Sequence, residues 1–230
     1  MSKEYFGARD YVSNSLLKLV SENPRQALKM IKGELGDEKT PALSYGSLVD
    51  CLLTTPDKFD EDYIIYRGKV PTDKLYDVAM EYVRIYQLEP RTEDFDVDGH
   101  IIQAQHNIGY DGRLLPATMI KRFRDECENY CTFYLANSDK IIVDETIYAE
   151  ANRLAINTKS SPYLNSIFQP DSNKIVLFQV AIFVTTTQFT GKVLIDCIVI
   201  DLEKKTITPY DFKTYEGSFE SNYWKYKYYY

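Results

Sequence analysis

The sequence predicts an α/β fold with a helical N-terminal part and a strand-rich C-terminal part. Its 230 residues are 44% hydrophobic and 27% charged, which suits one globular domain with a sizeable core. Apolar residues recur at helical spacing in several segments before residue 160, whereas residues 174–213 hold apolar runs separated by short polar turns. We find neither internal repeats nor a low-complexity linker. We expect the strands to form a sheet that helices flank.

The first helical segments are bounded by capping and breaking residues. Ser13 or Ser15 can cap a helix within residues 10–33, and Asn23-Pro24 breaks this segment in two. A further helix covers residues 42–53 and stops at the proline that follows. These segments therefore form the helical N-terminal part.

The middle of the chain mixes helical and polar segments. The polar stretch 94–112 holds both histidines, His100 and His106, and we expect them to be surface or loop residues. Helical periodicity and capping residues predict further helices at residues 72–87, 116–137 and 144–155.

Two carboxylates face each other in the predicted C-terminal hairpin. Asp196 interrupts an apolar run, and Asp211 lies in the next strand-like segment, after the polar turn 201–206. A hairpin centred between residues 203 and 204 places the two aspartates directly opposite, with Cβ atoms roughly 5 Å apart. Lys213 points to the same face, because alternate residues of a strand share a face.

This arrangement predicts a metal site. Two carboxylates so close together repel each other unless a cation lies between them, and Mg²⁺ is usually held by one or two carboxylates with water and phosphate. A bound metal promotes phosphoryl transfer, and a lysine can orient water or stabilise the developing charge. The pattern therefore indicates Mg²⁺- or Mn²⁺-dependent phosphodiester hydrolysis. The alternative is an exposed hairpin with ordinary charges, because Asp-x-Lys alone often occurs by chance.

Composition and charge narrow the class of protein. No apolar run reaches the length of a membrane helix, and the N-terminus has no signal-peptide character. The four cysteines match no zinc or iron–sulfur spacing, which favours buried, reduced thiols and a cytoplasmic location. The net charge of −7 argues against a broad nucleic-acid surface but allows a basic groove on an acidic body.

Most of the chain resembles the PD-(D/E)XK nuclease superfamily. It is most similar to the phage-type exonuclease VIII (RecE-like) nuclease domain, with RecB-like nucleases as more distant relatives. The segments that carry the resemblance are, in chain order, residues 12–17 with Asn23-Pro24, residues 42–53 with Pro56, residues 145–151, residues 191–196 and residues 210–214.

The resemblance implies a restriction-endonuclease-like core, in which a mixed sheet begins with an antiparallel meander and is flanked by helices. Within one domain over residues 1–230, it implies N-terminal helices in 1–60, a variable insertion in 61–143 and a catalytic core in 144–230. It further implies an exonuclease that resects linear double-stranded DNA ends in phage-type DNA recombination. Such enzymes act beside a single-strand annealing protein in the cytoplasm of a bacterium or phage-infected host, and often form homo-oligomeric rings.

The resemblance also assigns roles to the residues of the predicted hairpin. Asp196 and Asp211 would be metal ligands. Phe212 would offer its backbone carbonyl to the metal, while its ring faces the other side of the sheet. Lys213 would be the catalytic lysine.

Gln179 falls where many relatives carry a glutamate on the first core strand. A hairpin closing near residues 188–189 would place Ala181 opposite Asp196. Gln179 would then be a diagonal neighbour on the same face, roughly 7–8 Å away. Its amide would bind the attacking water or a metal-bound water. The alternative is a polar residue at a sheet edge.

The chain departs from the family pattern in three places. Asp50 stands where these exonucleases often place a metal-binding histidine, although an aspartate also suits Mg²⁺. Gln179 removes one negative charge from the site. The family usually carries a Gln-x-x-x-Tyr-like element after the lysine, and this chain ends where that element would begin, so we expect a fragment of a longer protein.

These departures leave two alternatives to a nuclease. One is a catalytically inactive nuclease-fold protein that binds DNA or a partner protein, but such a protein has little reason to keep Lys213 beside two carboxylates. The other is a structural protein of a phage, which the acidic charge would suit.

Overall fold

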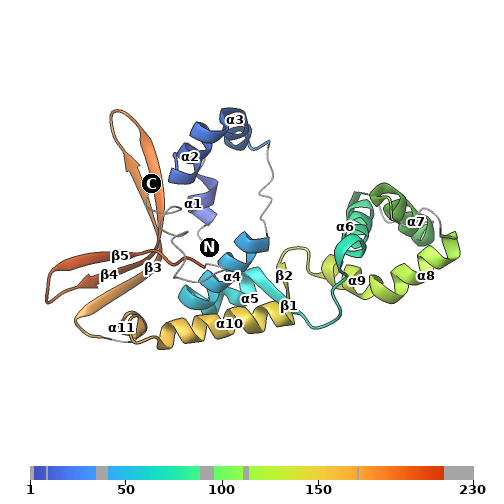
Figure 1. Ribbon diagram of the computed structural model, residues 1–230. Helices are drawn as coiled ribbons and strands as arrows, with labels where there is room; N and C mark the ends of the chain where they lie inside the picture. Colours follow the sequence, from blue (N-terminus) through green and yellow to red (C-terminus); the bar gives the residue numbers. More distant parts are fainter. Residues whose placement is uncertain are drawn as a thin grey trace. The chain divides into compact units, whose positions relative to one another are not determined.

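The computed structural model describes residues 3–8, 10–34, 41–88, 96–110, 114–169 and 171–214. The fold is mixed α/β, and the chain divides into two compact units (Figure 1). Unit 1 consists of Met1–Pro56 and Ala151–Tyr230, and unit 2 consists of Asp57–Glu150. The C-terminal element expected from the resemblance falls in residues 215–230, which lie outside the described residues.

Unit 1 contains a three-stranded antiparallel meander, as predicted. Its strands are β3 (Lys174–Thr185), β4 (Thr190–Asp201) and β5 (Thr206–Tyr210), in that order. In the second hairpin Cys197 pairs with Tyr210, which is the register expected from a turn centred between residues 203 and 204. The strand pairing therefore continues toward Asp196 and Asp211 as the sequence predicted.

The first hairpin has a different register from the one predicted. Ala181 pairs with Leu194 rather than with Asp196, so Gln179 lies level with Asp196. The reason is the turn, because the Thr186 hydroxyl accepts hydrogen bonds from the backbone N–H groups of residues 188 and 189. This hydroxyl stabilises a turn that starts at Thr186 and closes the hairpin one residue earlier than expected.

Two helices of unit 1, α2 and α3, begin at the capping residues that the sequence predicts. Leu16 N donates to Ser13 Oγ at the start of α2, and Gln26 N donates to Asn23 Oδ1 at the start of α3. Gly33 ends α3 in the left-handed conformation, with φ 71°. The helices are α1 (Lys3–Gly7), α2 (Asn14–Glu22), α3 (Pro24–Lys32), α4 (Pro41–Thr54), α10 (Glu145–Ser160), which begins in unit 2, and α11 (Asn165–Phe168).

The two faces of the meander carry different side chains. One face forms an apolar cluster around Ile167, Cys197 and Val199, to which α11 contributes. The other face carries Asp196, and α4 packs against β4 there. The sheet therefore separates an apolar layer from the layer that holds the predicted carboxylates.

Unit 2 is mainly helical, and two sequence predictions within it were wrong. Residues 97–108 form a helix rather than a loop, and His100 on it is only 9% exposed rather than a surface residue. The helix predicted at 116–137 is divided in two at Cys127. The elements are α5 (Phe59–Asp62), β1 (Tyr63–Tyr66), α6 (Asp73–Leu88), α7 (Val97–Ile108), α8 (Pro116–Glu126), α9 (Glu128–Ala136) and β2 (Ile141–Asp144), with β1 and β2 parallel and a 3₁₀ turn (Pro56–Lys58) before α5.

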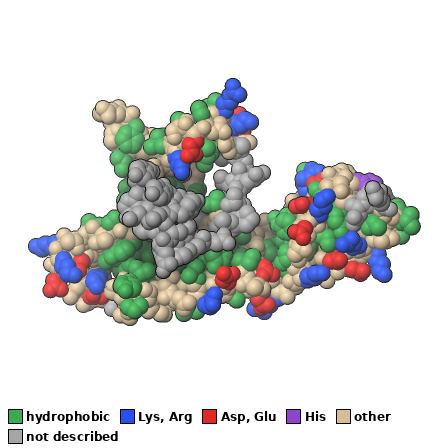
Figure 2. Space-filling model, in the orientation of Figure 1, with side chains coloured by type: hydrophobic (Ala, Val, Ile, Leu, Met, Phe, Trp, Pro, Cys, Tyr) green, Lys and Arg blue, Asp and Glu red, His purple; other side chains and the backbone are tan. Residues whose placement is uncertain are grey.

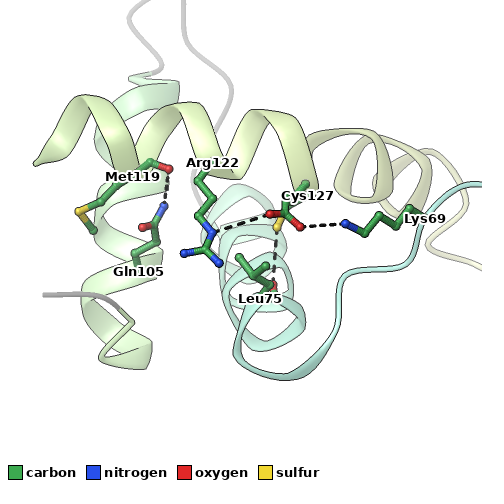
Figure 3. Close-up of polar contacts among 7 residues, drawn as sticks. Lys69, Leu75, Gln105, Met119, Arg122 and Cys127 are labelled. Carbon is green, nitrogen blue, oxygen red and sulfur yellow. Dashed lines mark hydrogen bonds and ion pairs between the residues drawn. The ribbon is translucent and has the colours of Figure 1, made fainter. Parts of the chain in front are cut away.

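Polar contacts join the helices of unit 2 (Figure 3). Gln105 Nε2 on α7 donates to the Met119 carbonyl on α8 at 3.0 Å. The Cys127 thiol donates to the Leu75 carbonyl of α6 at 3.7 Å, and burial raises the pKa of this thiol to about 11. A neutral thiol at physiological pH can therefore act as the donor. All four cysteines of the chain are buried thiols.

The surface shows mixed charge. On the face in Figure 2, Lys and Arg side chains alternate with Asp and Glu side chains rather than gathering in one patch. Among the helices that the structure describes, none is both long enough and apolar enough to cross a membrane.

Candidate functional site

Four charged residues of unit 1 come together on one face of the meander. Asp196 lies on β4, and Asp211 and Lys213 follow directly after the end of β5. Asp50 lies on α4 and interacts electrostatically with the other three. The structure thus brings together the predicted ligands and the predicted catalytic lysine, although Asp50 is distant from the others in sequence.

Asp196 is the most buried of these residues, at 9% exposed. Its Oδ2 atom accepts a hydrogen bond from Phe212 N at 2.7 Å and lies 3.9 Å from Lys213 Nζ. Burial raises the pKa of Asp196, and the Phe212 N–H and the Lys213 ammonium oppose this rise. A buried carboxylate held by a single backbone donor retains an oxygen that can accept another ligand.

Lys213 connects the carboxylates of Asp196 and Asp211. Its ammonium group forms an ion pair and hydrogen bond with Asp211 Oδ1, and it is the same group that approaches Asp196. Burial alone would lower the pKa of Lys213, but Asp211, Asp196 and Asp50 together raise it. Lys213 is therefore a cation at physiological pH and balances part of the negative charge of the site.

Asp50 is half-buried and titrates near neutrality. Burial, together with the Asp196 and Asp211 carboxylates, raises its pKa to about 7, against the opposing effect of the Lys213 ammonium. A carboxyl group in this state readily exchanges its proton for a cation.

Gly46 lies one helical turn before Asp50, on the same side of α4. A Cβ atom added there would lie 3.3 Å from Thr214 Oγ1. The glycine thus lets α4 approach the chain that follows β5. We did not predict this role, although a glycine inside a helical segment is a signal of close approach.

Phe212 separates the carboxylate site from the apolar layer. Its backbone N–H points to Asp196, while its ring stacks on Phe168 with centroids 6.3 Å apart on the other side of the sheet, as expected. This ring anchors the segment that carries Asp211 and Lys213. The role predicted for its carbonyl oxygen stays a prediction.

Gln179 has an uncommon backbone conformation at the position level with Asp196. Its φ is 52°, in the middle of β3, and the residues on either side of it remain paired with β4 in one register. A non-glycine residue in the left-handed region costs about 1–2 kcal/mol. Such strain often occurs at functional sites, so it supports a role for Gln179 beside Asp196.

The strain at Gln179 leads to a testable contrast. We expect Gln179→Val to lower the free energy of unfolding by about 2 kcal/mol, because a β-branched side chain is poorly tolerated at positive φ. Gln179→Gly should leave it within about 1 kcal/mol of the parent, since glycine adopts this conformation readily. Urea unfolding measures both values. Equal destabilisation by the two changes would contradict strain at this position.

The donor atoms of the site are hard oxygens of the kind that Mg²⁺ and Mn²⁺ prefer. Within the described part of the chain, no three Asp, Glu, His or Cys side chains are grouped closely enough to hold a metal ion in this arrangement. The cation that contacts Asp211 in this arrangement is the Lys213 ammonium group. The two histidines belong to α7 of unit 2.

Comparisons of the chain with protein-family models, curated protein sequences and solved structures found no match. The interpretation of the site therefore rests on the sequence pattern and on this geometry.

Proposed function

We propose that this protein is a metal-dependent deoxyribonuclease of the PD-(D/E)XK type, most simply an exonuclease that resects linear double-stranded DNA ends. One observation carries the proposal. The register of the second hairpin leads Asp196 and Asp211 to one place, where Lys213 contacts Asp211 and Asp50 faces them from α4. Three carboxylates and one lysine on one face of the sheet are the kinds of side chain that metal-assisted phosphodiester hydrolysis uses.

In this proposal Asp50, Asp196, Asp211 and the Phe212 carbonyl oxygen would hold the ion, once Lys213 leaves Asp211 and the carboxylates draw closer together than they are in the structure. Mg²⁺ or Mn²⁺, when bound, supplies positive charge to the phosphoryl oxygens and acidifies the attacking water. The Lys213 ammonium turns from Asp211 toward the scissile phosphate and stabilises its developing charge. The Gln179 carboxamide, level with Asp196, hydrogen-bonds the attacking water.

Proton release at Asp50 is part of the same proposal. This carboxyl group has a pKa of about 7 in the absence of metal, because burial and two neighbouring carboxylates favour its neutral form. A bound cation would reverse the effect of those neighbours, so Asp50 would hold it in the ionised form. The family resemblance alone supports three further parts of the proposal: a role in phage-type recombination, an annealing partner and a ring-shaped oligomer.

The direct test uses end-labelled linear duplex DNA and closed-circular duplex DNA, each incubated with Mg²⁺, Mn²⁺ or EDTA. We expect loss of the linear DNA alone, with either metal and not with EDTA. Loss of both DNAs would show that the protein is an endonuclease rather than an exonuclease, because closed-circular DNA has no ends. A folded protein that binds the duplex but cuts neither DNA would support the non-cutting, DNA-binding alternative.

A further inference from the structure

A cavity lies in unit 1 on the apolar face of the meander. Its volume is about 700 Å³, within the range of about 300–1,000 Å³ for small-molecule sites. Its lining comes from the end of α4, the end of α10, α11, the segment after α11 and β3, and includes Thr54, Lys159, Phe168, Ser172, Lys174 and Phe178. Asp196 and the other residues of the carboxylate site belong to the opposite face.

Aromatic rings form one wall of this cavity. Phe168 and Phe178 stack with centroids 5.7 Å apart and an interplanar angle of 10°. The aliphatic side chains of Ile167 and Val176 extend the apolar wall. A planar aromatic ligand can lie against such a wall, since base–aromatic stacking is favourable for any base.

Lys159 provides a cation within the same cavity. Its Nζ atom donates to the Leu52 carbonyl at 2.9 Å and lies 5.9 Å from the centroid of the Phe168 ring. This hydrogen bond to the last turn of α4 uses one of the three N–H donors of the ammonium group. Within the described part of the chain no carboxylate pairs with Lys159, and burial lowers its pKa.

The charges around the cavity favour an anion. Lys174 Nζ forms an ion pair with Asp171 Oδ2 at 3.1 Å, so the charges of these two residues offset each other. The positive charge of Lys159 then gives the cavity lining a net charge of one cation. An uncharged ligand would bury the Lys159 ammonium further without compensating it. An inorganic anion alone would leave the aromatic wall in contact with water.

We propose that this cavity binds a small aromatic phosphate ester of the nucleoside monophosphate class. The base would lie against the parts of the Phe168 and Phe178 rings that stay exposed beside their mutual stack and the contact with Phe212, and the phosphate would accept hydrogen bonds from Lys159. The site is separate from the proposed nuclease chemistry, because it lies on the other face of the sheet and needs no metal ion.

Isothermal titration with thymidine 5′-monophosphate in the presence of EDTA tests the proposal. We expect binding at least tenfold tighter than that of thymidine or of inorganic phosphate. Absence of binding at millimolar nucleotide would overturn the proposal, and so would equal affinity for phosphate alone. EDTA removes any metal-dependent cleavage, so failure of the nuclease proposal leaves this result unaffected.

Lys159→Gln should weaken nucleotide binding at least tenfold, because it removes a charge-assisted hydrogen bond. Lys204→Gln, at an exposed position in the β4–β5 turn, is the matched control and should not change the affinity. Equal affinities of the two variants would contradict the role of Lys159.

A measurement on the unmutated protein covers the case in which Lys159→Gln also loosens α4. Saturation-transfer NMR, with irradiation of the protein, should mark the base protons of the bound nucleotide more strongly than the ribose protons. Stronger marking of the ribose would contradict stacking on the aromatic wall.

Discussion

Raising the pH from 5 to 8 in metal-free buffer is expected to lower the free energy of unfolding of this protein by about 2–3 kcal/mol through Asp50 alone. The pKa of this carboxyl group is about 7 in the folded chain, against 3.8 for the solvated aspartate of the unfolded chain. Between those values the folded chain keeps a proton that the unfolded chain has released, so stability falls as the pH rises. Urea unfolding in EDTA at several pH values measures the effect.

Asp50→Asn provides the decisive variant for this prediction. It should remove most of the decline with pH and should be more stable than the parent at pH 8, because a neutral amide replaces a carboxylate that is buried near Asp196 and Asp211. Asp10→Asn, at an exposed position of unit 1, controls for the loss of one aspartate. Similar pH profiles for the parent and Asp50→Asn would show that Asp50 ionises normally.

Asp196→Asn and Lys213→Ala are each expected to reduce Mg²⁺-dependent cleavage of linear duplex DNA by about 10²–10³-fold or more. Asparagine keeps an oxygen that can accept from Phe212 N, so the fold around β4 should persist while a metal ligand is lost. Lys213 lies outside the regular strands, and its loss should also leave the meander intact. Initial rates with end-labelled DNA measure the loss.

Two matched variants control this experiment. Asp10→Asn removes an exposed carboxylate, and Lys204→Ala removes an exposed lysine from the β4–β5 turn. Both should cleave at the rate of the parent. If Asp196→Asn or Lys213→Ala also did so, the cleavage would have to come from another site or from a contaminating enzyme.

The second hairpin was predictable because one polar turn separates two apolar strands. Asp201 fixes that turn by accepting from Lys204 N, so the pairing of Cys197 with Tyr210 follows from the local sequence. The first hairpin was not predictable in the same way. Residues 185–190 offer several similar turn positions, and the Thr186 hydroxyl decides between them.

Helix α7 was missed because polar residues lie on its buried face. His100 and Gln105 are buried together with Ile101 and Ala104, and this mixture conceals the apolar periodicity. Local sequence patterns also could not predict the approach of Asp50 to Asp196 and Asp211. It depends on the long-range packing of α4 against β4, and only the family resemblance pointed to it.

The interrupted course of unit 1 has a consequence for biosynthesis. Asp50 belongs to its first segment, whereas Asp196, Asp211 and Lys213 belong to its second, and the whole of unit 2 is translated between them. On the ribosome, unit 2 is complete while the meander is still unmade, and domains generally fold as units during synthesis. Helix α4 must therefore wait for its partner strand, and the carboxylate site is assembled among the last parts of the described chain.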